Sequence, residues 1–499
     1  MRYFPSPFHL FISFTILCFH SIHAAEIERY LYPYPQKLAF QKTSKPNNFS
    51  TADIEEIQQF VYTALPLKIE GEITLHLASG KSFQFNFHID STRLQEQAYK
   101  IKLEGSQVKI TGHKLQGLYY AKQTFHQVLN YFKTEQLDIV NLEIHDWPNF
   151  ARRGYMLDIS RDKVPTMSTI YRIIQNLASW KINEFQLYVE HTYAYKNHET
   201  VWKNASPILP EEIQLLDQYC KARFIDLVPN QNSFGHMENW LKHDAYLDLA
   251  ECPDDCNTVW GMRKRSSLNP TDPRSLQLMQ ELYAEYLPNF SSPYCNIGCD
   301  ETVELGLGRS KDSCKEIGQG QVYLNYLNRL NEAVNEHGKR AQFWGDIIES
   351  YPKLIPKLPK NMTALVWGYE GDFPFEKKLP KFKKAEIPFY VCPGTSSWRS
   401  LIGKNNNAFD NLRNAAIFGM KNKATGYLNT DWGDYGHWQP LSISYPTQLL
   451  GAQYAWNYRE TAIIHMDAQV NEVFFQDSTG RLSQALLKLG NAYQKSKNP

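Results

Sequence analysis

The sequence lacks a hydrophobic run that is long enough to cross a membrane. Its longest apolar stretch, residues 8–19, is shorter than the roughly 20 apolar residues that a bilayer core requires. The stretch follows Arg2 and precedes the small residues Ala24 and Ala25, which is the order of a secretory signal peptide. We therefore expect residues 1–25 to be an export leader and the mature chain to be periplasmic or secreted, with no membrane span. Lipid attachment at Cys18 is a weaker alternative, because small residues do not precede it.

The sequence also has almost no net charge. Its 53 Lys and Arg residues nearly balance its 52 Asp and Glu residues, and the formal net charge is +1. The two signs are mixed along the chain, so no basic stripe suggests a nucleic acid and no acidic tail suggests a charged partner. We expect no nucleic acid partner.

Cysteine is scarce, with 8 residues in 499. Once Cys18 is removed with the leader, an odd number remains, so at least one thiol is unpaired. Cys252 and Cys256 enclose a polar, turn-rich loop, where a local disulfide is expected. A zinc site with four thiolates, adding Cys295 and Cys299, is the disfavoured alternative, because alternation in a strand-like run explains the spacing of that second pair. We therefore expect no metal.

The first part of the mature chain, residues 26–147, has short alternating runs that indicate half-buried strands, and one stretch with helical spacing. The runs are residues 73–77, 99–103 and 108–110, and the helical stretch is 117–125. This pattern predicts a small α+β domain. Pro148 interrupts it, because proline cannot donate to a ladder and biases the preceding residue away from helix.

The second part, residues 148–465, alternates apolar strand-like runs with amphipathic helical stretches. The expected strands are 154–159, 184–189, 224–229, 294–298, 341–344, 364–367, 388–392 and 425–430, and the expected helices are 168–180, 210–222, 273–287, 319–336, 406–420 and 446–457. Eight such units predict a (β/α)8 TIM barrel, an α/β fold with a parallel sheet. An open doubly wound sheet also fits, but the glycine-rich phosphate loop expected after its first strand is missing, and no cofactor is expected. A long insertion spans 231–272, and a helical tail, 466–499, contains a helix over 482–495.

Acids and indoles gather where the barrel strands end, and in a TIM barrel the active site lies at these C-terminal ends. The acids Asp300 and Glu301 follow the fourth strand. Indoles lie at or near the ends of the last four strands: Trp344, Trp367, Trp398 and Trp432. Each alone is more typical of packing or of a solvated turn. Together they indicate a sugar pocket, because the apolar C–H faces of a pyranose lie well on aromatic rings.

These residues resemble those of a known family. Residues 296–301, Asn-Ile-Gly-Cys-Asp-Glu, resemble the His-x-Gly-Gly-Asp-Glu signature of glycoside hydrolase family 20, the β-N-acetylhexosaminidases. Further similarities run along most of the mature chain: Arg153-Gly154, Leu-Asp-Ile-Ser-Arg at 157–161, Phe234-Gly-His236, Trp344, Trp367 and Trp432-Gly-Asp434. The small α+β domain is similar to the non-catalytic domain of that family.

The resemblance implies an exo-acting enzyme that removes terminal β-linked N-acetylglucosamine or N-acetylgalactosamine from N-acetylhexosamine-containing glycans or chito-oligosaccharides, with retention of configuration. Adjacent residues that leave a strand are expected to point in different directions, so Asp300 and Glu301 should not flank one bond about 5 Å apart, as in ordinary retaining enzymes. The resemblance supplies another nucleophile, the 2-acetamido oxygen of the substrate. Glu301 would then be the acid and base, and Asp300 would accept the acetamido N–H.

The other roles implied by the resemblance concern recognition. Arg153 would donate to sugar O3 and O4 with its rigid fork, and His236 would support the acid/base. Trp344, Trp367 and Trp432 would form apolar walls, and Asp434 would accept from O4 or O6. For the tyrosine that holds the acetamido oxygen, Tyr390, Tyr369 and Trp398 are the candidates.

Three residues depart from the family pattern: Asn296 stands where His is common, Cys299 where Gly is common, and His191 where an acid is usual. They motivate an alternative, a catalytically impaired carbohydrate-binding protein on the same barrel. Another alternative is a barrel hydrolase of neutral β-glycans. A Glu301→Gln variant tests the first, and a comparison of the N-acetylglucosaminide with the plain glucoside tests the second.

Overall fold

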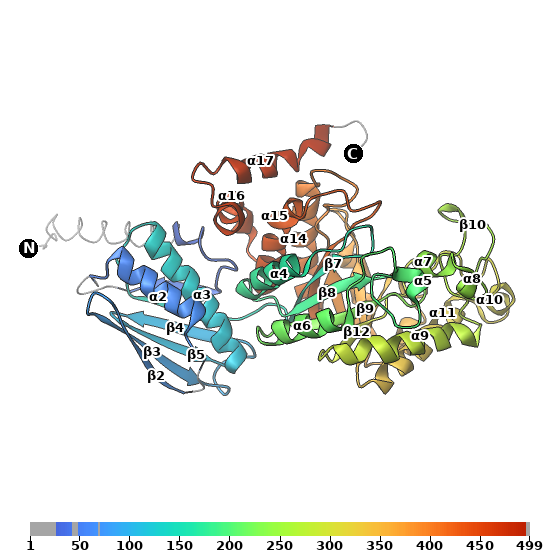
Figure 1. Ribbon diagram of the computed structural model, residues 1–499, viewed down its shortest axis with the longest axis horizontal. Coiled ribbons are helices and arrows are strands. Elements are labelled where there is room, and N and C mark those ends of the chain that lie inside the picture. The colour runs from blue at the N-terminus through green and yellow to red at the C-terminus, as the bar shows by residue number, and fades with distance from the viewer. Residues whose placement is uncertain (1–25, 42–47, 68–69, 496–499) are drawn as a thin grey trace, which may run out of the picture. The chain divides into compact units, whose positions relative to one another are not determined.

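The computed structural model describes residues 26–41, 48–67 and 70–495, so the expected leader lies outside the described residues. Contacts divide the chain into two compact units (Figure 1). Of the described residues, the first comprises those up to Asn149 together with Ser179–Lys181 and Ala452–Ala485; the second comprises Phe150–Ala178, Ile182–Gly451 and those from Leu486 onward. Residues 452–485 thus pack with the N-terminal part of the chain, whereas the sequence suggested that the barrel continues to residue 465.

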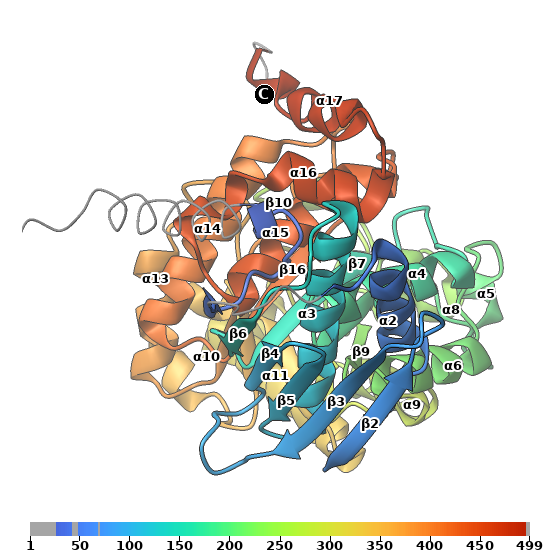
Figure 2. The same cartoon turned by 90° about the vertical axis from the view of Figure 1, so that its left-hand side faces the viewer.

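The first unit is built on a six-stranded sheet in the order β1-β6-β4-β5-β3-β2. Its strands are β1 (Lys37–Phe40), β2 (Gly71–His76), β3 (Ser82–Ile89), β4 (Tyr99–Glu104), β5 (Gln107–Gly112) and β6 (Leu142–Asp146), and its main helices are α2 (Thr51–Thr63) and α3 (Leu115–Thr134). The helices lie on one face of the sheet (Figure 2). Alternation along β3 buries Phe83, Phe85 and Phe87 in the core. The α+β prediction is confirmed, although β1, β3, β6 and α2 were not predicted.

Asp146 ties the separate segments of the first unit together. Its carboxylate accepts a hydrogen bond from Nε1 of Trp456 at 2.9 Å and pairs with the ammonium of Lys181 at 3.4 Å. All three residues are fully buried. A charge in such a place is stable only when it is paired and hydrogen-bonded, so residues from three distant parts of the sequence are needed to complete this core.

The second unit is a closed barrel of eight parallel strands in the order β12-β13-β14-β15-β16-β7-β8-β9. The strands are β7 (Arg152–Asp158), β8 (Glu184–Val189), β9 (Asp226–Gln231), β12 (Tyr294–Asn296), β13 (Arg340–Trp344), β14 (Thr363–Trp367), β15 (Phe389–Cys392) and β16 (Gly426–Asp431). The main helices around them are α4 (Met167–Ser179), α6 (Pro210–Lys221), α9 (Pro273–Tyr286), α11 (Gln319–Glu336), α13 (Phe375–Lys384), α14 (Asn405–Asn422) and α15 (Tyr445–Trp456), of which residues 452–456 belong to the first unit. The TIM barrel prediction is confirmed, strand by strand.

Side chains fill the inside of this barrel, so it is a core and not a pore. Toward the N-terminal side, Glu184, Gln186 and Gln342 exchange hydrogen bonds of 2.7–3.2 Å. Above them lies an apolar cluster that includes Met156, Trp344 and Trp432. The three side chains of the polar layer are fully buried, so the chemistry must be sought above the apolar cluster, at the C-terminal ends of the strands.

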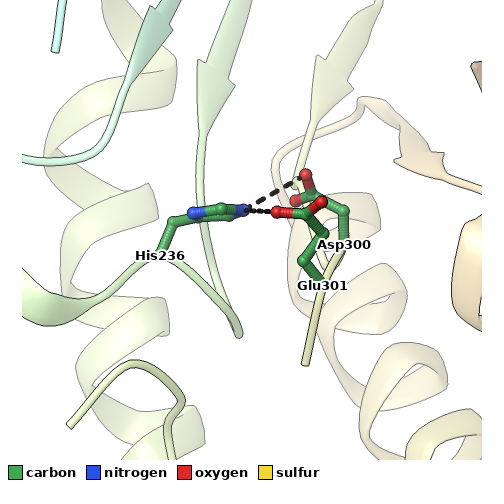
Figure 3. Close-up of side chains that lie close together, drawn as sticks. All are labelled: His236, Asp300 and Glu301. Atoms are coloured by element: carbon green, nitrogen blue, oxygen red, sulfur yellow. Dashed lines mark ion pairs between the residues drawn. The ribbon is translucent and has the colours of Figure 1, made fainter. Parts of the chain in front are cut away.

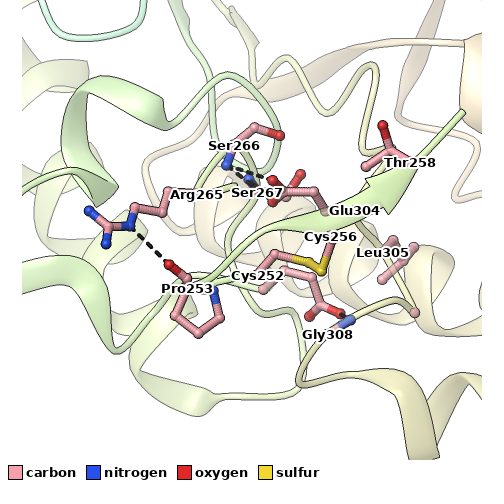
Figure 4. The surroundings of a disulfide bond; sticks show 12 residues. Cys252, Pro253, Cys256, Thr258, Arg265, Ser266, Ser267, Glu304, Leu305 and Gly308 are labelled. Carbon is pink, nitrogen blue, oxygen red and sulfur yellow. Dashed lines mark hydrogen bonds between the residues drawn. A yellow bond between two sulfur atoms is a disulfide. The ribbon is translucent and has the colours of Figure 1, made fainter. Parts of the chain in front are cut away.

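The long insertion after β9 forms secondary structure of its own. It contains α7 (Glu238–Leu241), α8 (Asp244–Leu247) and a hairpin of β10 (Cys256–Thr258) and β11 (Gly261–Arg263). The expected disulfide between Cys252 and Cys256 is formed, and nearby the carboxylate of Glu304 accepts the backbone N–H groups of Ser266 and Ser267 (Figure 4). The disulfide uses two of the four thiols that the zinc alternative required.

After α15 the chain forms the short helix α16 (Met466–Val470), then α17 (Arg481–Leu489) and the 3-10 turn η6 (Ala492–Lys495). The single expected helix over 482–495 is therefore two elements with a break at residues 490–491. Across the described part of the chain, no helix combines the length and the apolar character that a membrane span needs.

Candidate active site

Three functional side chains meet at the C-terminal ends of β9 and β12. Nε2 of His236, which follows β9, lies 3.4 Å from Oδ2 of Asp300 and 3.4 Å from Oε2 of Glu301. Both carboxylates approach the imidazole from the same side (Figure 3). The structure therefore brings together the predicted acid pair and the predicted supporting histidine.

The acid pair converges because the backbone before it is tightly turned. Cys299 and Glu301 both have left-handed backbone conformations, with φ of 70° and 49°, a region that non-glycine residues seldom adopt. A Cβ on Gly235 would lie 2.4 Å from the carbonyl oxygen of Asp300, so only glycine lets the histidine loop approach the acid pair this closely. The expectation that the two side chains point in different directions is thus wrong, because it assumed an extended backbone.

The charge on His236 is set by the two acids. Desolvation alone would lower its pKa, but the negative charge of Asp300 and the hydrogen bonds to Asp300 and Glu301 outweigh it and hold the pKa of His236 well above its usual value. The two acids therefore favour the protonated form of the imidazole. A protonated Nε2–H has two carboxylates within reach and can pass its hydrogen bond from one to the other during a reaction.

Behind the histidine lies Glu190, which follows β8. Its Oε1 is 4.0 Å from Nδ1 of His236 and 3.0 Å from the guanidinium of Arg161. Burial raises the pKa of Glu190 to about 7, although the charges of Arg161 and His236 oppose this shift. Arg161 also pairs with Asp158 at 2.8 Å and stacks its guanidinium 5.2 Å from the Trp432 ring centre. Arginine and acids thus form one continuous buried network.

The sequence argument predicted that Arg153 binds the sugar, but the structure does not place Arg153 at the site. It is the second residue of β7, it is fully buried, and its guanidinium donates to the carbonyl of Phe150 at 2.8 Å. Arg153 therefore lies at the N-terminal end of the barrel, whereas a substrate meets the C-terminal ends. Arg161, beyond the C-terminal end of the same strand, lines the cavity instead.

Asp346 is a residue that the sequence argument passed over as part of a strand end. Its Oδ2 accepts the backbone N–H of Glu301 at 3.0 Å, so it holds the left-handed turn that carries the acid. Desolvation and the negative charge of Asp300 raise the pKa of Asp346 well above its usual range. An acid two residues after Trp344, just beyond the end of a strand, was the available signal.

The predicted indoles do converge on the site. Trp344 and Trp432 have ring centres 5.8 Å apart, and Trp367 stacks on Tyr369 at 5.2 Å. Together with Trp398 and Asp434 these residues line one cavity with the acid pair. Desolvation raises the pKa of Asp434, against the opposing charge of Arg161. The cavity is therefore apolar on its walls and acidic at its base.

Among the three candidates for the acetamido-binding residue, the geometry separates Tyr369 from Tyr390. The hydroxyl of Tyr390 bonds Glu184 at 3.1 Å, in the polar layer inside the barrel. The hydroxyl of Tyr369 accepts the Nε1–H of Trp432 at 2.7 Å in the cavity wall. The same hydroxyl is also hydrogen-bonded to Thr430, so it is held in place in the cavity wall.

The three departures from the family pattern do not line the cavity. Asn296 donates to Gln186 at 3.0 Å, below the site. Cys299 is buried and points its thiol toward the carbonyl of Ile297 at 3.4 Å. Nδ1 of His191 contacts Asn239 at 3.2 Å, and burial lowers the pKa of this histidine to about 4. These substitutions leave the acid pair and the indoles in place.

The cavity has a volume of about 790 Å³, within the range of about 300–1,000 Å³ that is usual for pockets holding drug-sized ligands. Polar atoms of His236, Asp300 and Glu301 lie within 4.8 Å of one another, so these would be the residues to hold a divalent cation. Their mutual ion pairs already neutralise part of the acidic charge. We therefore interpret the three residues as a cluster that transfers protons.

Comparisons with known proteins match both parts of the chain. Residues 150–397 match the catalytic domain of glycosyl hydrolase family 20, and residues 30–147 match its domain 2. The chain is 24% identical over 311 residues to a beta-hexosaminidase of Porphyromonas gingivalis, covering 56% of this chain and 38% of that protein. It is 24% identical over 373 residues to beta-hexosaminidase subunit A1 of Dictyostelium discoideum, covering 68% and 67%. The chain thus spans well under half of the length of the bacterial relative.

Among solved structures, an exo beta-N-acetylglucosaminidase from Vibrio harveyi shares the fold with a TM-score of 0.67 at 17% identity, covering 93% of this chain and 78% of that one. The two family models are adjacent and match the two parts of the chain that the fold separates, the α+β sheet and the barrel. The chain therefore belongs to glycoside hydrolase family 20.

Proposed function

We propose that this chain is an exo-acting β-N-acetylhexosaminidase that releases terminal, non-reducing β-linked N-acetylglucosamine or N-acetylgalactosamine with retention. The carrying observation is that Asp300 and Glu301 converge on one imidazole nitrogen at the base of an indole-lined cavity. The names of the relatives, beta-hexosaminidases, agree with it. The substrate class is N-acetylhexosamine-containing glycans or chito-oligosaccharides.

Distance alone does not identify the nucleophile. An oxygen of Asp300 and one of Glu301 lie within 4.8 Å of each other, close to the separation of about 5–5.5 Å in ordinary retaining enzymes. Those enzymes place the acid and the nucleophile on two sides of the glycosidic bond. Here the two acids share one histidine and approach it from one side (Figure 3), so the nucleophile is supplied by the 2-acetamido oxygen of the substrate.

In this reaction Glu301 gives its proton to the leaving oxygen while the acetamido oxygen attacks the anomeric carbon. The products of the step are the free aglycone and a cyclic oxazolinium. Glu301 then removes a proton from water, which opens the ring and restores the acid. Protonated His236 donates to both acids and steadies the negative charge on Glu301 once its proton has left. Because the nucleophile is tethered, the entropic barrier is lowered.

Asp300 is placed to steady the substrate nucleophile. Within the described residues, its buried Oδ1 has no hydrogen-bond partner, and a buried oxygen of this kind is costly unless a ligand donates to it. The acetamido N–H is such a donor, and the hydroxyl of Tyr369 is placed to donate to the acetamido oxygen. Together they would orient the amide for attack.

Recognition of the terminal sugar is assigned to an arginine and an acid that line the cavity. Arg161, in place of Arg153, offers a fixed fork to vicinal hydroxyls, and Asp434 accepts from O4 or O6. Trp344, Trp367 and Trp432 provide apolar walls. Their closure of one end of the cavity accounts for action at chain ends.

Replacement of the acid by its amide tests the proposal. We expect Glu301→Gln to lower kcat on 4-nitrophenyl N-acetyl-β-glucosaminide by about 10²–10⁴-fold, with Glu316→Gln, an exposed acid that does not line the cavity, as the matched control. Equal rates for wild type and Glu301→Gln would favour the binding-protein alternative. Hydrolysis of the plain β-glucoside as fast as of the N-acetylglucosaminide, or no inhibition by a thiazoline analogue, would contradict the role of the acetamido group.

We also propose that residues 1–25 direct export. The disulfide between Cys252 and Cys256 supports this, because disulfides persist mainly in oxidising compartments outside the cytosol. N-terminal sequencing of the protein secreted by its producing cell checks it. A mature protein that still begins at Met1 would contradict the leader.

A further inference from the structure

The cavity extends beyond the residues that the proposed chemistry uses. Past the indoles it continues to a rim formed by Trp398, Arg399, Lys404, Asn407 and Tyr493, which we call the outer rim. Arg399 is exposed and Lys404 is half-buried, whereas Asp300 is buried. A single sugar is smaller than the drug-sized ligands that a cavity of about 790 Å³ holds, so the outer rim has room for the next unit of a glycan.

The C-terminal segment holds the outer rim in place through hydrogen bonds. The first N–H groups of a helix have no partner within the helix. In α14, those of Asn405, Asn406 and Asn407 donate to the carbonyl of Gly490 at 2.8 Å, to Oδ1 of Asn491 at 2.9 Å and to the hydroxyl of Tyr493 at 3.0 Å. Residues 490–493 therefore cap α14 and bring the ring of Tyr493 into the wall of the cavity.

The side-chain amide of Asn407 is fully occupied by the protein. Its Nδ2 donates to the carbonyl of Tyr369 at 2.7 Å and to Oγ of Ser396 at 3.0 Å, and its Oδ1 accepts the N–H of Gly371 at 2.9 Å. Asn407 thus holds the rim together and is not placed to read a ligand. The polar side chains left for that task at the rim are the two cations, together with Glu370, an exposed acid that also lines the cavity.

The two cations of the rim are not neutralised in the way that the cation at the base is. Arg161 contacts two carboxylates, at 2.8 and 3.0 Å. Among the ion pairs of the described residues, none joins Arg399 or Lys404 to an acid. Each instead lies over an aromatic ring: Arg399 is 5.1 Å from the centre of Tyr435, and Lys404 is 5.9 Å from that of Tyr493. The base of the cavity is therefore acidic, whereas at its rim two cations outnumber one acid, Glu370.

We propose that the outer rim binds the sugar on the leaving side of the scissile bond and selects one that bears a carboxylate. This inference rests on the proposed function, because it concerns the same cleft and the same reaction. The terminal N-acetylhexosamine, which is neutral, occupies the base. The next sugar lies between the rings of Trp398 and Tyr493, and its carboxylate meets Arg399 and Lys404. The carboxylate is either at C6, as in a uronic acid, or on a lactyl ether, as in muramic acid.

Matched disaccharides test this inference. The lactyl arm compares N-acetylglucosaminyl-β-1,4-N-acetylmuramic acid with chitobiose, and the uronate arm compares N-acetylglucosaminyl-β-1,4-glucuronate with its glucose counterpart. We expect the acidic member of at least one pair to have a kcat/KM about 3- to 10-fold higher, since an exposed ion pair is worth about 1 kcal/mol or less and two cations contribute. The arm that shows the preference identifies the carboxylate. The preference should shrink as salt is added.

The controls use charge changes of equal size. In the double variant Arg399→Gln and Lys404→Gln, the ratio of acidic to neutral hydrolysis should fall to about one. In Lys353→Gln and Lys377→Gln, two exposed lysines that do not line the cavity, the ratio should stay at its wild-type value. Neutral disaccharides hydrolysed as fast as acidic ones by the wild type would overturn the inference and leave the proposed function standing. If the aryl N-acetylglucosaminide and all the disaccharides resist hydrolysis, both fail.

Discussion

The base and the outer rim of the cavity hold their charges in opposite ways. At the base, Arg161 contacts Asp158 and Glu190, and His236 contacts Asp300 and Glu301. At the rim, Arg399 and Lys404 face aromatic rings and solvent. The base is therefore an interlocked network in which one change disturbs every partner, whereas the rim can change without disturbing the reaction. The difference separates residues that set the chemistry from residues that set preference.

Replacing an arginine by lysine should lower kcat/KM far more at the base of the cavity than at its outer rim. Lysine keeps the charge but loses the rigid fork, so Arg161→Lys forfeits at least one charged hydrogen bond, worth about 1.5–3 kcal/mol. We expect kcat/KM on the aryl N-acetylglucosaminide to fall by about 100-fold. In Arg399→Lys the fall should be no more than about 3-fold. Equal losses in steady-state assays would show that the two regions are coupled.

The pH dependence of stability should reveal the buried acid of the base. The pKa of Glu190 is raised to about 7, above its ordinary value of about 4.3, so its contribution is fully present below the ordinary value and is lost as the pH rises through 7. Between pH 5 and pH 7, the free energy of unfolding of the wild type should fall by about 2 kcal/mol more than that of Glu190→Gln. Urea unfolding at both pH values measures this. Parallel curves would contradict a protonated Glu190.

Asp346 allows the supporting part of the base to be tested by two nearly isosteric changes. Asp346→Asn keeps an oxygen for the N–H of Glu301, whereas Asp346→Leu leaves this N–H without its acceptor, at a cost of about 1–3 kcal/mol. We expect kcat of the leucine variant to be about 10-fold below that of the asparagine variant. As the pH rises, the asparagine variant should also lose less activity than the wild type, since Asn cannot acquire the charge that would repel Asp300. Identical pH–rate profiles for the wild type and Asp346→Asn would rule out a role for Asp346 ionisation.

The smallest effect is expected at the rim. Tyr493→Phe removes the hydroxyl that accepts the N–H of Asn407, a bond worth about 1 kcal/mol or less. Thermal unfolding should show a loss of this size, and Tyr435→Phe, with an exposed ring, is the matched control. A loss above about 2 kcal/mol would mean that the C-terminal cap is as tightly coupled as the base.

The sequence predicted the barrel well because each strand and helix carries its own periodic signal. The expected helix 319–336 and strand 184–189 have the observed bounds. The short helix α13 was missed, because it has Pro380 inside it and a run of lysines. Local patterns thus identify elements whose burial is regular, and fail where packing overrides propensity.

The site was predicted less evenly. Arg153 was chosen from similarity alone, although a strand rises about 3.3 Å per residue, which puts residues 153 and 161 near opposite ends of the barrel. Counting along β7 would have corrected it. The convergence of Asp300 and Glu301 could not be predicted, since it depends on left-handed backbone at Cys299 and Glu301. Tyr493 was beyond reach because its contact with Asn407 joins distant parts of the sequence.

The cap on α14 bears on how the protein can be shortened or tagged. Trimming the chain after α17 would leave three helix N–H groups without acceptors and open one wall of the cavity, while every residue of the acid pair and its histidine remained. A lowered turnover in such a fragment would then report on a missing wall and not on damaged chemistry.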